Sequence, residues 1–369
     1  MERYAWMDNL RVLMIVLVVI LHTCVTYSGL GGWYYKENMQ VDMYSTIFFA
    51  FYLTFTQAYF MSLLFMVSGY FTQRSLLRKG AINYSLGRLK RLGIPLLIFI
   101  FLIQPFTVML AYPDLNIVDW YLGGLKDFEF IGWTGPLWFV EALLIFTLIY
   151  VLIFRLFIRR EFKIKLKVTY LNVSMLILLI TAVAFLLRLN NPIGSNFYNL
   201  QFSFFSAYVI MFAVGIIAFS AGIFEQITFK DGKRWLAISL GLGIPGWCML
   251  IYFAGFLEGS RMFEGGMNGP AFFYALWESF VCVTFILALI GIFRYRLNIK
   301  GKLQQFLSDN AFGVFVFHAP VLVGISMLLK DFSILPVPKF FLVFTLAVPL
   351  SFLVSWLVRR IGVLRSVFS

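Results

Sequence analysis

Long apolar runs separated by short polar segments make up most of this chain, from about its tenth residue onward. About 20 apolar residues in a helix cross a bilayer core of about 30 Å, so runs of this length predict transmembrane helices. The pattern indicates an all-α, polytopic membrane protein with about ten transmembrane helices. Their expected ranges are 10–28, 46–72, 94–112, 136–158, 168–188, 204–222, 236–256, 270–293, 309–329 and 339–358.

The composition agrees with a surface that faces lipid. Of the 369 residues, 61% are hydrophobic and 13% are charged, whereas a soluble domain carries about 25% charged residues. A soluble enzyme is therefore excluded. No internal repeat interrupts the pattern, so we expect residues 1–369 to form a single integral-membrane domain. The first apolar run lacks a clear cleavage site and is expected to stay as a span.

The basic residues predict the orientation of the chain. With the N-terminus in the cytoplasm, 24 of the 30 Lys and Arg residues fall on the cytoplasmic side, as the positive-inside rule requires. They gather near both termini and in the segments 73–93, 155–167, 223–235 and 294–305. We therefore expect both termini in the cytoplasm. Because topology explains the net charge of +13, no nucleic-acid partner is expected.

Four titratable side chains lie inside predicted spans: His22, Glu141, Glu278 and His318. Such groups are costly in a membrane and usually mark functional sites. With a rise of about 1.5 Å per residue, all four fall at a similar height in the middle or outer half of the bilayer. For each of them, the alternative is a structural hydrogen bond to a neighbouring helix.

The spacing of Arg11 and His22 sets them on one stripe of the first span. Eleven residues correspond to about 1100° of helical turn, which places the two side chains within about 20° of the same face. Arg11 is then expected at the cytoplasmic boundary, with His22 about three turns above it. A cation below and a proton acceptor above suit a substrate that enters from the cytoplasm and reacts within the membrane.

Five short motifs follow one another along the chain. They are Trp6-Met-Asp-Asn-Leu-Arg11 followed by His22, Phe65-Met-Val-Ser68-Gly69-Tyr70, Arg88-Leu-Lys-Arg91 before Pro95, Gly135-Pro-Leu-Trp138-Phe-Val-Glu141, and Asn310-Ala-Phe-Gly-Val-Phe-Val-Phe-His318. In this order they resemble the membrane-bound acyltransferase-3 family, over nearly the whole chain. The most similar branch is that of the glucan-modifying succinyltransferases.

The resemblance implies an O-acyltransferase of the bacterial cytoplasmic membrane. It would transfer an acyl group, acetyl or succinyl, from cytoplasmic acyl-CoA to a hydroxyl of an extracytoplasmic glycan, with no bound cofactor. The resemblance makes His22 catalytic with Arg11 as its motif partner, and it makes Arg88 and Arg91 ligands of the donor. Further candidates are Glu141 in the catalytic group, and Glu278, His318, Ser68 and Trp138 in supporting positions.

The chemistry of these residues fits acyl transfer. A sugar hydroxyl needs a base to accept its proton as it attacks a thioester, and histidine has a suitable pKa. Either Glu141 or Glu278 could orient His22, as a carboxylate does in catalytic triads. Ser68 offers a route through an acyl-enzyme, although Ser-Gly in a membrane helix is more typical of close packing.

Two other functions stay open at this stage. A transporter or flippase for a glycan or a lipid-linked precursor also places charges at the midplane, and a structural or sensory subunit would not need His22. A metal centre is not expected, because the chain has two histidines and its three cysteines show no ligand spacing. The loop 113–135 contains aromatic residues that suit either an interfacial belt or a platform for sugar rings.

Overall fold

The computed structural model describes residues 4–37, 40–158 and 164–368. Within these ranges the chain contains helices and no strand, and ten helices are long and apolar enough to cross a membrane. The spans are α1 (Ala5–Ser28), α2 (Met43–Lys79), the segmented helix Ala81–Ala111, Gly135–Phe157 around α7 (Trp138–Ile153), α8 (Tyr170–Asn190), Phe202–Ala221 around α9 (Phe205–Ala221), Phe229–Glu258 around α11 (Phe229–Phe253), α12 (Gly269–Arg296), α13 (Lys302–Leu328) and α14 (Pro336–Arg360). The all-α, multi-pass prediction is confirmed.

All ten predicted spans are present, and most of their ends agree within a few residues. The largest difference concerns the third span, which was expected from residue 94 and begins at Ala81. Its first turns include Arg88, Lys90 and Arg91, which lower the hydropathy of the segment. Arg and Lys are nevertheless good helix formers, so the helix continues beyond the apolar run that predicts it.

Two π-helical segments interrupt the third span. Leu89–Gly93 precedes α4 (Ile94–Ile98), and Phe99–Ile103 separates α4 from α5 (Gln104–Ala111). Both α4 and α5 carry a proline in their first turn, and proline has no N–H to donate and crowds the carbonyl four residues earlier. A wider turn accommodates that mismatch. π-helical turns of this kind occur frequently at functional sites.

Glycines bring α2 and α9 into backbone contact. A Cβ atom at Gly69 would overlap the carbonyl oxygen of Phe212, and one at Gly215 would overlap that of Met66. Small residues at such crossings allow membrane helices to pack closely. Ser68 therefore stands beside a close-packing contact, the structural role that a Ser-Gly pair suggests in a membrane helix.

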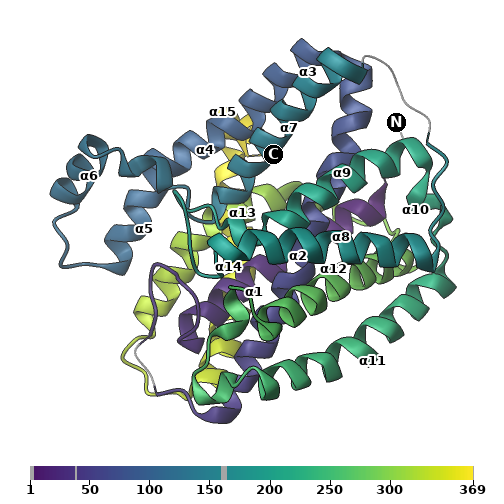
Figure 1. Ribbon diagram of the computed structural model, residues 1–369. Coiled ribbons are helices and arrows are strands. Elements are labelled where there is room, and N and C mark those ends of the chain that lie inside the picture. The colour runs from purple at the N-terminus through teal and green to yellow at the C-terminus, as the bar shows by residue number, and fades with distance from the viewer. Residues whose placement is uncertain (1–3, 38–39, 159–163, 369) are drawn as a thin grey trace.

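The helix ends form two different faces of the bundle. One face, here called the basic end, carries the Lys and Arg residues of the segments 73–93, 223–235 and 294–305. There, Asn9 donates to the carbonyl of Leu297 at 2.7 Å and Arg294 donates to the carbonyl of Phe224 at 2.8 Å. The opposite face, here called the loop end, is built from the segments 29–37, 112–134, 191–201, 254–268 and 329–335. From it the short helix α6 (Ile117–Lys126) projects away from the bundle (Figure 1).

Two more short helices complete the described chain, α10 (Ile223–Gln226) after α9 and α15 (Gly362–Val367) after α14. Four residues that were expected on the cytoplasmic side, Arg3, Arg159, Arg160 and Lys163, lie outside the described residues. The remaining basic residues of the predicted cytoplasmic segments lie near helix ends or in the connections between helices, as Lys165, Lys167 and Lys300 do. The orientation of the bundle in a membrane stays a prediction.

Candidate active site

The two histidines of the chain meet inside the bundle. His22 projects from α1 and His318 from α13, and His22 Nδ1 lies 3.1 Å from His318 Nε2. The two rings are nearly parallel, at an interplanar angle of 26°. His318 is fully buried, with 0% of its surface exposed. The expectation that both histidines lie at one height is therefore met, and they form a direct pair.

The hydrogen bonds assign a tautomer to each ring. His318 Nδ1 lies 2.8 Å from the carbonyl oxygen of Phe315, which only accepts, so His318 Nδ1 carries the hydrogen. In a neutral imidazole the other nitrogen is then an acceptor. His318 Nε2 consequently accepts from His22 Nδ1–H. His22 also hydrogen-bonds the backbone of Val18. When Nδ1–H makes both bonds, His22 Nε2 is an unprotonated nitrogen, which is the state that a general base requires.

Trp33 covers the face of His22. The two ring centroids are 3.9 Å apart and their planes are inclined by only 21°. Tyr34 packs edge-on against Trp33 and its hydroxyl donates to the side-chain carbonyl of Gln104. Burial raises the pKa of Tyr34, so the hydroxyl keeps its proton and remains a donor.

A buried ion pair anchors the segment that carries Trp33. Lys339 Nζ lies 2.5 Å from Glu37 Oε1 and 2.9 Å from the carbonyl of Phe332, and Lys339 is 0% exposed. The backbone N–H of Glu37 donates to the carbonyl of Thr26 at 3.0 Å. The segment 29–37 is thus attached to α1 and α14 rather than lying loosely over the bundle.

A cavity of about 1540 Å³ extends from the loop end down to His22. This is larger than the roughly 300–1,000 Å³ of ordinary small-molecule pockets. Most polar residues of its wall are aromatic or neutral amides, namely Trp33, Tyr34, Trp138, Tyr208, Tyr274, Gln57, Gln104, Asn196, Asn199 and Gln201; three charged residues, Lys36, Arg261 and Glu264, also line it. Planar rings together with amide donors and acceptors suit a neutral ligand that is rich in hydroxyl groups.

Neither glutamate orients His22, in contrast to the expectation for Glu141 and Glu278. Glu278 Oε2 lies 2.5 Å from Arg188 Nη2, and both side chains are buried. Glu141 lies beside Thr134 and its Oε2 has no hydrogen-bond partner within the described residues. His318 Nε2 lies next to His22 Nδ1, where a glutamate carboxylate was expected. The hydrogen-bond partner of His22 is therefore a neutral imidazole rather than an anion.

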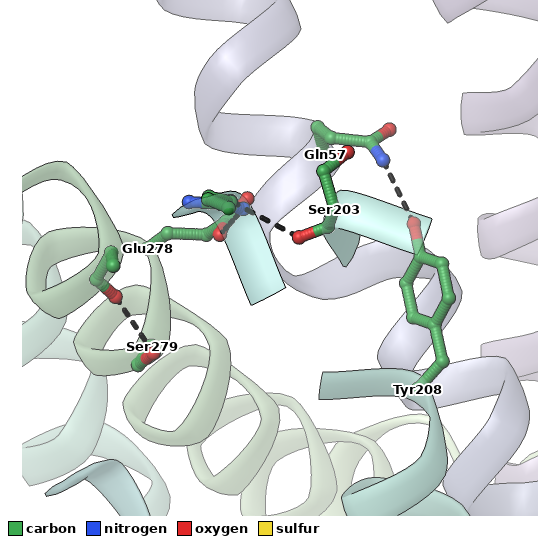
Figure 2. A network of polar contacts seen from close by, with 7 residues as sticks. Gln57, Ser203, Tyr208, Glu278 and Ser279 are labelled. Carbon is green, nitrogen blue, oxygen red and sulfur yellow. Dashed lines mark hydrogen bonds and ion pairs between the residues drawn. The ribbon is translucent and has the colours of Figure 1, made fainter. Parts of the chain in front are cut away.

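The Arg188–Glu278 pair lies close to residues that line the cavity. Figure 2 shows Glu278 near Ser203, with Gln57 and Tyr208 alongside. Arg188 Nε also donates to the carbonyl of Ser203 at 3.0 Å. Its guanidinium lies over the ring of Tyr274, which lines the cavity. Close by, the Gln57 amide donates to the Tyr208 hydroxyl at 2.8 Å. The ion pair therefore supports residues that form the cavity surface.

Three arginines gather at the basic end. Arg91 lies within electrostatic reach of Arg11 and Arg88. Arg11 forms an ion pair with Asp8 at 3.2 Å, and Arg88 donates to the Tyr84 hydroxyl at 2.7 Å. Arg91 is thus near both Arg11 and Arg88. Among the described residues that line the cavity, none of these three arginines occurs.

The two remaining candidates have different positions. Trp138, at the start of α7, lines the cavity and stacks on Tyr208 with ring centroids 5.5 Å apart. Ser68 does not line the cavity. In the part of the chain that the structure describes, no three His, Cys, Asp or Glu side chains gather as a metal site would require.

Several residues at the site carried no clear sequence signal. Trp33 lies in a short loop, where an aromatic residue looks like part of an interfacial belt. Arg188 and Lys339 are the last and first residues of the expected spans 168–188 and 339–358, and both belong to the six basic residues that were not placed on the cytoplasmic side; the structure shows both as buried ion-pair partners. One sequence signal could have indicated a buried cation: a carboxylate inside a membrane, such as Glu278, needs a positively charged partner.

Comparison with known proteins places these residues in a family context. The acyltransferase-3 family, described as an acyltransferase domain, matches residues 4–360. Glucans biosynthesis protein C of Escherichia coli (strain SMS-3-5 / SECEC) is 28% identical over 158 residues, 42% of this chain and 40% of that protein. The protein of the same name from Salmonella typhi is 27% identical over 163 residues, 43% of this chain and 41% of that protein. The match spans about two fifths of these relatives. No solved structure matches the chain.

Proposed function

This chain belongs to the acyltransferase-3 family, and from that premise we propose that it transfers an acyl group from cytoplasmic acyl-CoA to a hydroxyl of an extracytoplasmic glycan. The product is an O-acyl ester, and the protein acts in the bacterial cytoplasmic membrane with both termini inside. The names of the relatives, which refer to glucan biosynthesis, support a glucan as the acceptor. Acetyl and succinyl are the two acyl groups to be tested.

The single observation that carries the proposal is the histidine pair at the deep end of the cavity. His22 Nε2 is free to accept the proton of an attacking hydroxyl, while His22 Nδ1–H is bound to His318 at 3.1 Å. When His22 becomes protonated, the Nδ1–H···Nε2 hydrogen bond becomes charge-assisted and therefore stronger. His318 thus serves the developing imidazolium much as a carboxylate does in a triad.

The basic end is proposed to receive the donor. Arg11, Arg88 and Arg91 offer planar guanidinium groups, which suit the phosphates of CoA. Along α1, His22 stands about 16 Å from Arg11, a distance that a flexible pantetheine arm can span. Ile15 and Val18 lie between them and are buried, so side chains have to move aside when the arm reaches His22.

The large cavity is proposed to receive the acceptor. Its mouth lies among the segments of the loop end and its deep end includes His22, so a glycan and the donor would approach the base from opposite sides. Neutral amides and aromatic rings are suited to sugar hydroxyls and to the apolar faces of sugar rings. Transfer is then direct from thioester to hydroxyl, without a step at Ser68.

The test is acceptor-dependent release of free CoA by the purified protein in detergent. Acetyl-CoA and succinyl-CoA are offered separately, with an oligoglucan as acceptor, and wild type is compared with His22→Ala. We expect release with one of the donors, an esterified glucan by mass spectrometry, and loss of both in a folded His22→Ala protein. Trp356→Phe, at a site far from the cavity lining, is the matched control for handling and folding.

Two outcomes would contradict the proposal. Full activity of His22→Ala would show that His22 is not the general base. Absence of CoA release with either donor would show that the protein is not a transferase for these acyl groups. In the second case, flux of the glucan across vesicles that contain the protein would support a transporter instead.

A further inference from the structure

The indole nitrogen of Trp33 is a buried donor without a partner. Trp33 Nε1 contacts no acceptor among the described residues, although an indole N–H can only donate. Buried polar atoms in native proteins are almost always satisfied, so an unsatisfied one in a functional region asks for an explanation. Trp33 lines the cavity, as does His22. The N–H itself is closed off from water, so a ligand oxygen supplies the missing acceptor only when neighbouring side chains shift as the ligand enters.

The stacking geometry places this donor beside the reacting centre. The indole lies on the imidazole of His22 with centroids 3.9 Å apart and planes inclined by 21°. The N–H bond of an indole lies in the plane of the ring. The Trp33 donor therefore lies in the ring plane that is stacked directly on the imidazole of His22.

The reaction needs such a donor. Attack on a thioester turns the carbonyl oxygen into an oxyanion, which is stabilised by donors that are already in position. Backbone N–H groups usually take this role, but His22 and His318 both lie inside helices, where the N–H groups are bound to carbonyls four residues earlier. The two helices that carry the histidines therefore offer no free backbone donor next to the base, whereas Trp33 offers a side-chain donor on a ring stacked against His22.

Building on the proposed function, we propose that Trp33 Nε1–H is the oxyanion donor of this acyltransferase. His22 Nε2 takes the proton of the acceptor hydroxyl as its oxygen bonds to the thioester carbon, and the carbonyl electron pair moves to the oxygen bound by Trp33. The tetrahedral species then re-forms the carbonyl and expels the CoA thiolate, which receives the proton from His22. Ester and free CoA are the products, and the base is restored.

The anchor of the 29–37 segment supports this role. Glu37 and Lys339 form an ion pair at 2.5 Å with Lys339 fully buried. Removing two charges from water is costly, and such pairs are better explained by the precise arrangement they impose than by net stabilisation. Here the pair fixes the chain four residues after Trp33, and the indole is thereby positioned before substrate binds.

The test removes the N–H and keeps the ring. Trp33→Phe retains an aromatic stack, and replacement of Trp33 by 3-benzothienylalanine retains the full ring size with sulfur in place of N–H. We expect kcat to fall by about 10²–10³-fold in both variants, as for other single oxyanion donors, with KM for donor and acceptor changed less than about threefold. The pH profile of kcat should keep its shape, because His22 remains the base.

Three results decide the inference. A kcat equal to wild type in both folded variants would overturn it, and so would a raised acceptor KM at unchanged kcat, which would assign the N–H to a sugar hydroxyl. In either case an inactive His22→Ala protein in the same assay would leave the proposed function intact. Full activity of His22→Ala, or an inactive wild type, would instead overturn the proposed function and this inference together.

Discussion

Replacing His318 tests the histidine pair most directly. In His318→Leu, the Nδ1–H of His22 loses its acceptor while the volume of the buried site is roughly kept. A hydrogen bond to a charged group contributes about 1.5–3 kcal/mol, and this bond is charged only after His22 has taken a proton. The loss therefore falls mainly on the transition state and predicts a kcat lower by about 10- to 150-fold. The KM of either substrate should change little.

The matched variant is His318→Gln. Its side-chain oxygen can accept from His22 Nδ1–H near the position of the lost nitrogen, so we expect a loss several-fold smaller than that of His318→Leu. Single-turnover CoA release, followed in detergent with saturating acceptor, measures the chemical step, and thermal unfolding checks that both variants fold. Equal rates for wild type and His318→Leu would refute the tautomer argument. Equal losses in the Leu and Gln variants would show that packing, rather than the acceptor, matters.

Three further substitutions probe the surroundings of the site. Arg88→Gln should raise the KM for acyl-CoA about tenfold at nearly unchanged kcat, since one charge-assisted contact to phosphate is lost; Lys90→Gln, in the same segment, should leave that KM unchanged in steady-state assays. Glu278→Gln should destabilise the fold by about 3–5 kcal/mol, because the buried charge of Arg188 loses its counter-ion. A wild-type unfolding temperature in detergent would contradict this. Gly69→Val should prevent normal packing of α2 on α9, seen as loss of folded protein in size-exclusion chromatography; wild-type yield would show that the two backbones can separate.

The architecture was predictable because it follows from one-dimensional patterns. Apolar runs of span length predicted ten helices, and all ten are present. Errors arose where helix formation and hydropathy differ, as at Ala81, since a helix continues through arginines and lysines that do not belong in lipid. Arg188 and Lys339 stand at the outer ends of two expected spans, and their burial could not be predicted, because a buried cation looks the same in sequence as one in water.

Of the predicted candidates, His22 and Trp138 line the cavity and His318 contacts His22, whereas Glu141, Glu278 and Ser68 do not line it; their catalytic roles stay predictions. Depth along a helix can be counted, so His22 and His318 could be placed at one height. Which side chains then meet depends on the rotation of each helix and on neighbours almost 300 residues apart in sequence. For this reason the two glutamates looked as suitable as His318. The loop position of Trp33 follows from an ion pair between distant segments, Glu37 and Lys339, which no local pattern reveals.

The interrupted third span has a mechanical consequence. The backbones of α2 and α9 touch at Gly69 and Gly215, so this part of the bundle resists bending. The span Ala81–Ala111 contains two π-helical segments, and side chains such as Leu97 and Leu102 are more than half exposed at its outer surface. This span also carries Arg88 and Arg91. We expect this span to bend when the pantetheine arm of the donor enters. Amide hydrogen exchange should then be faster at Leu89–Ile103 than in α9. Equal protection of the two segments would show that another part of the bundle moves instead.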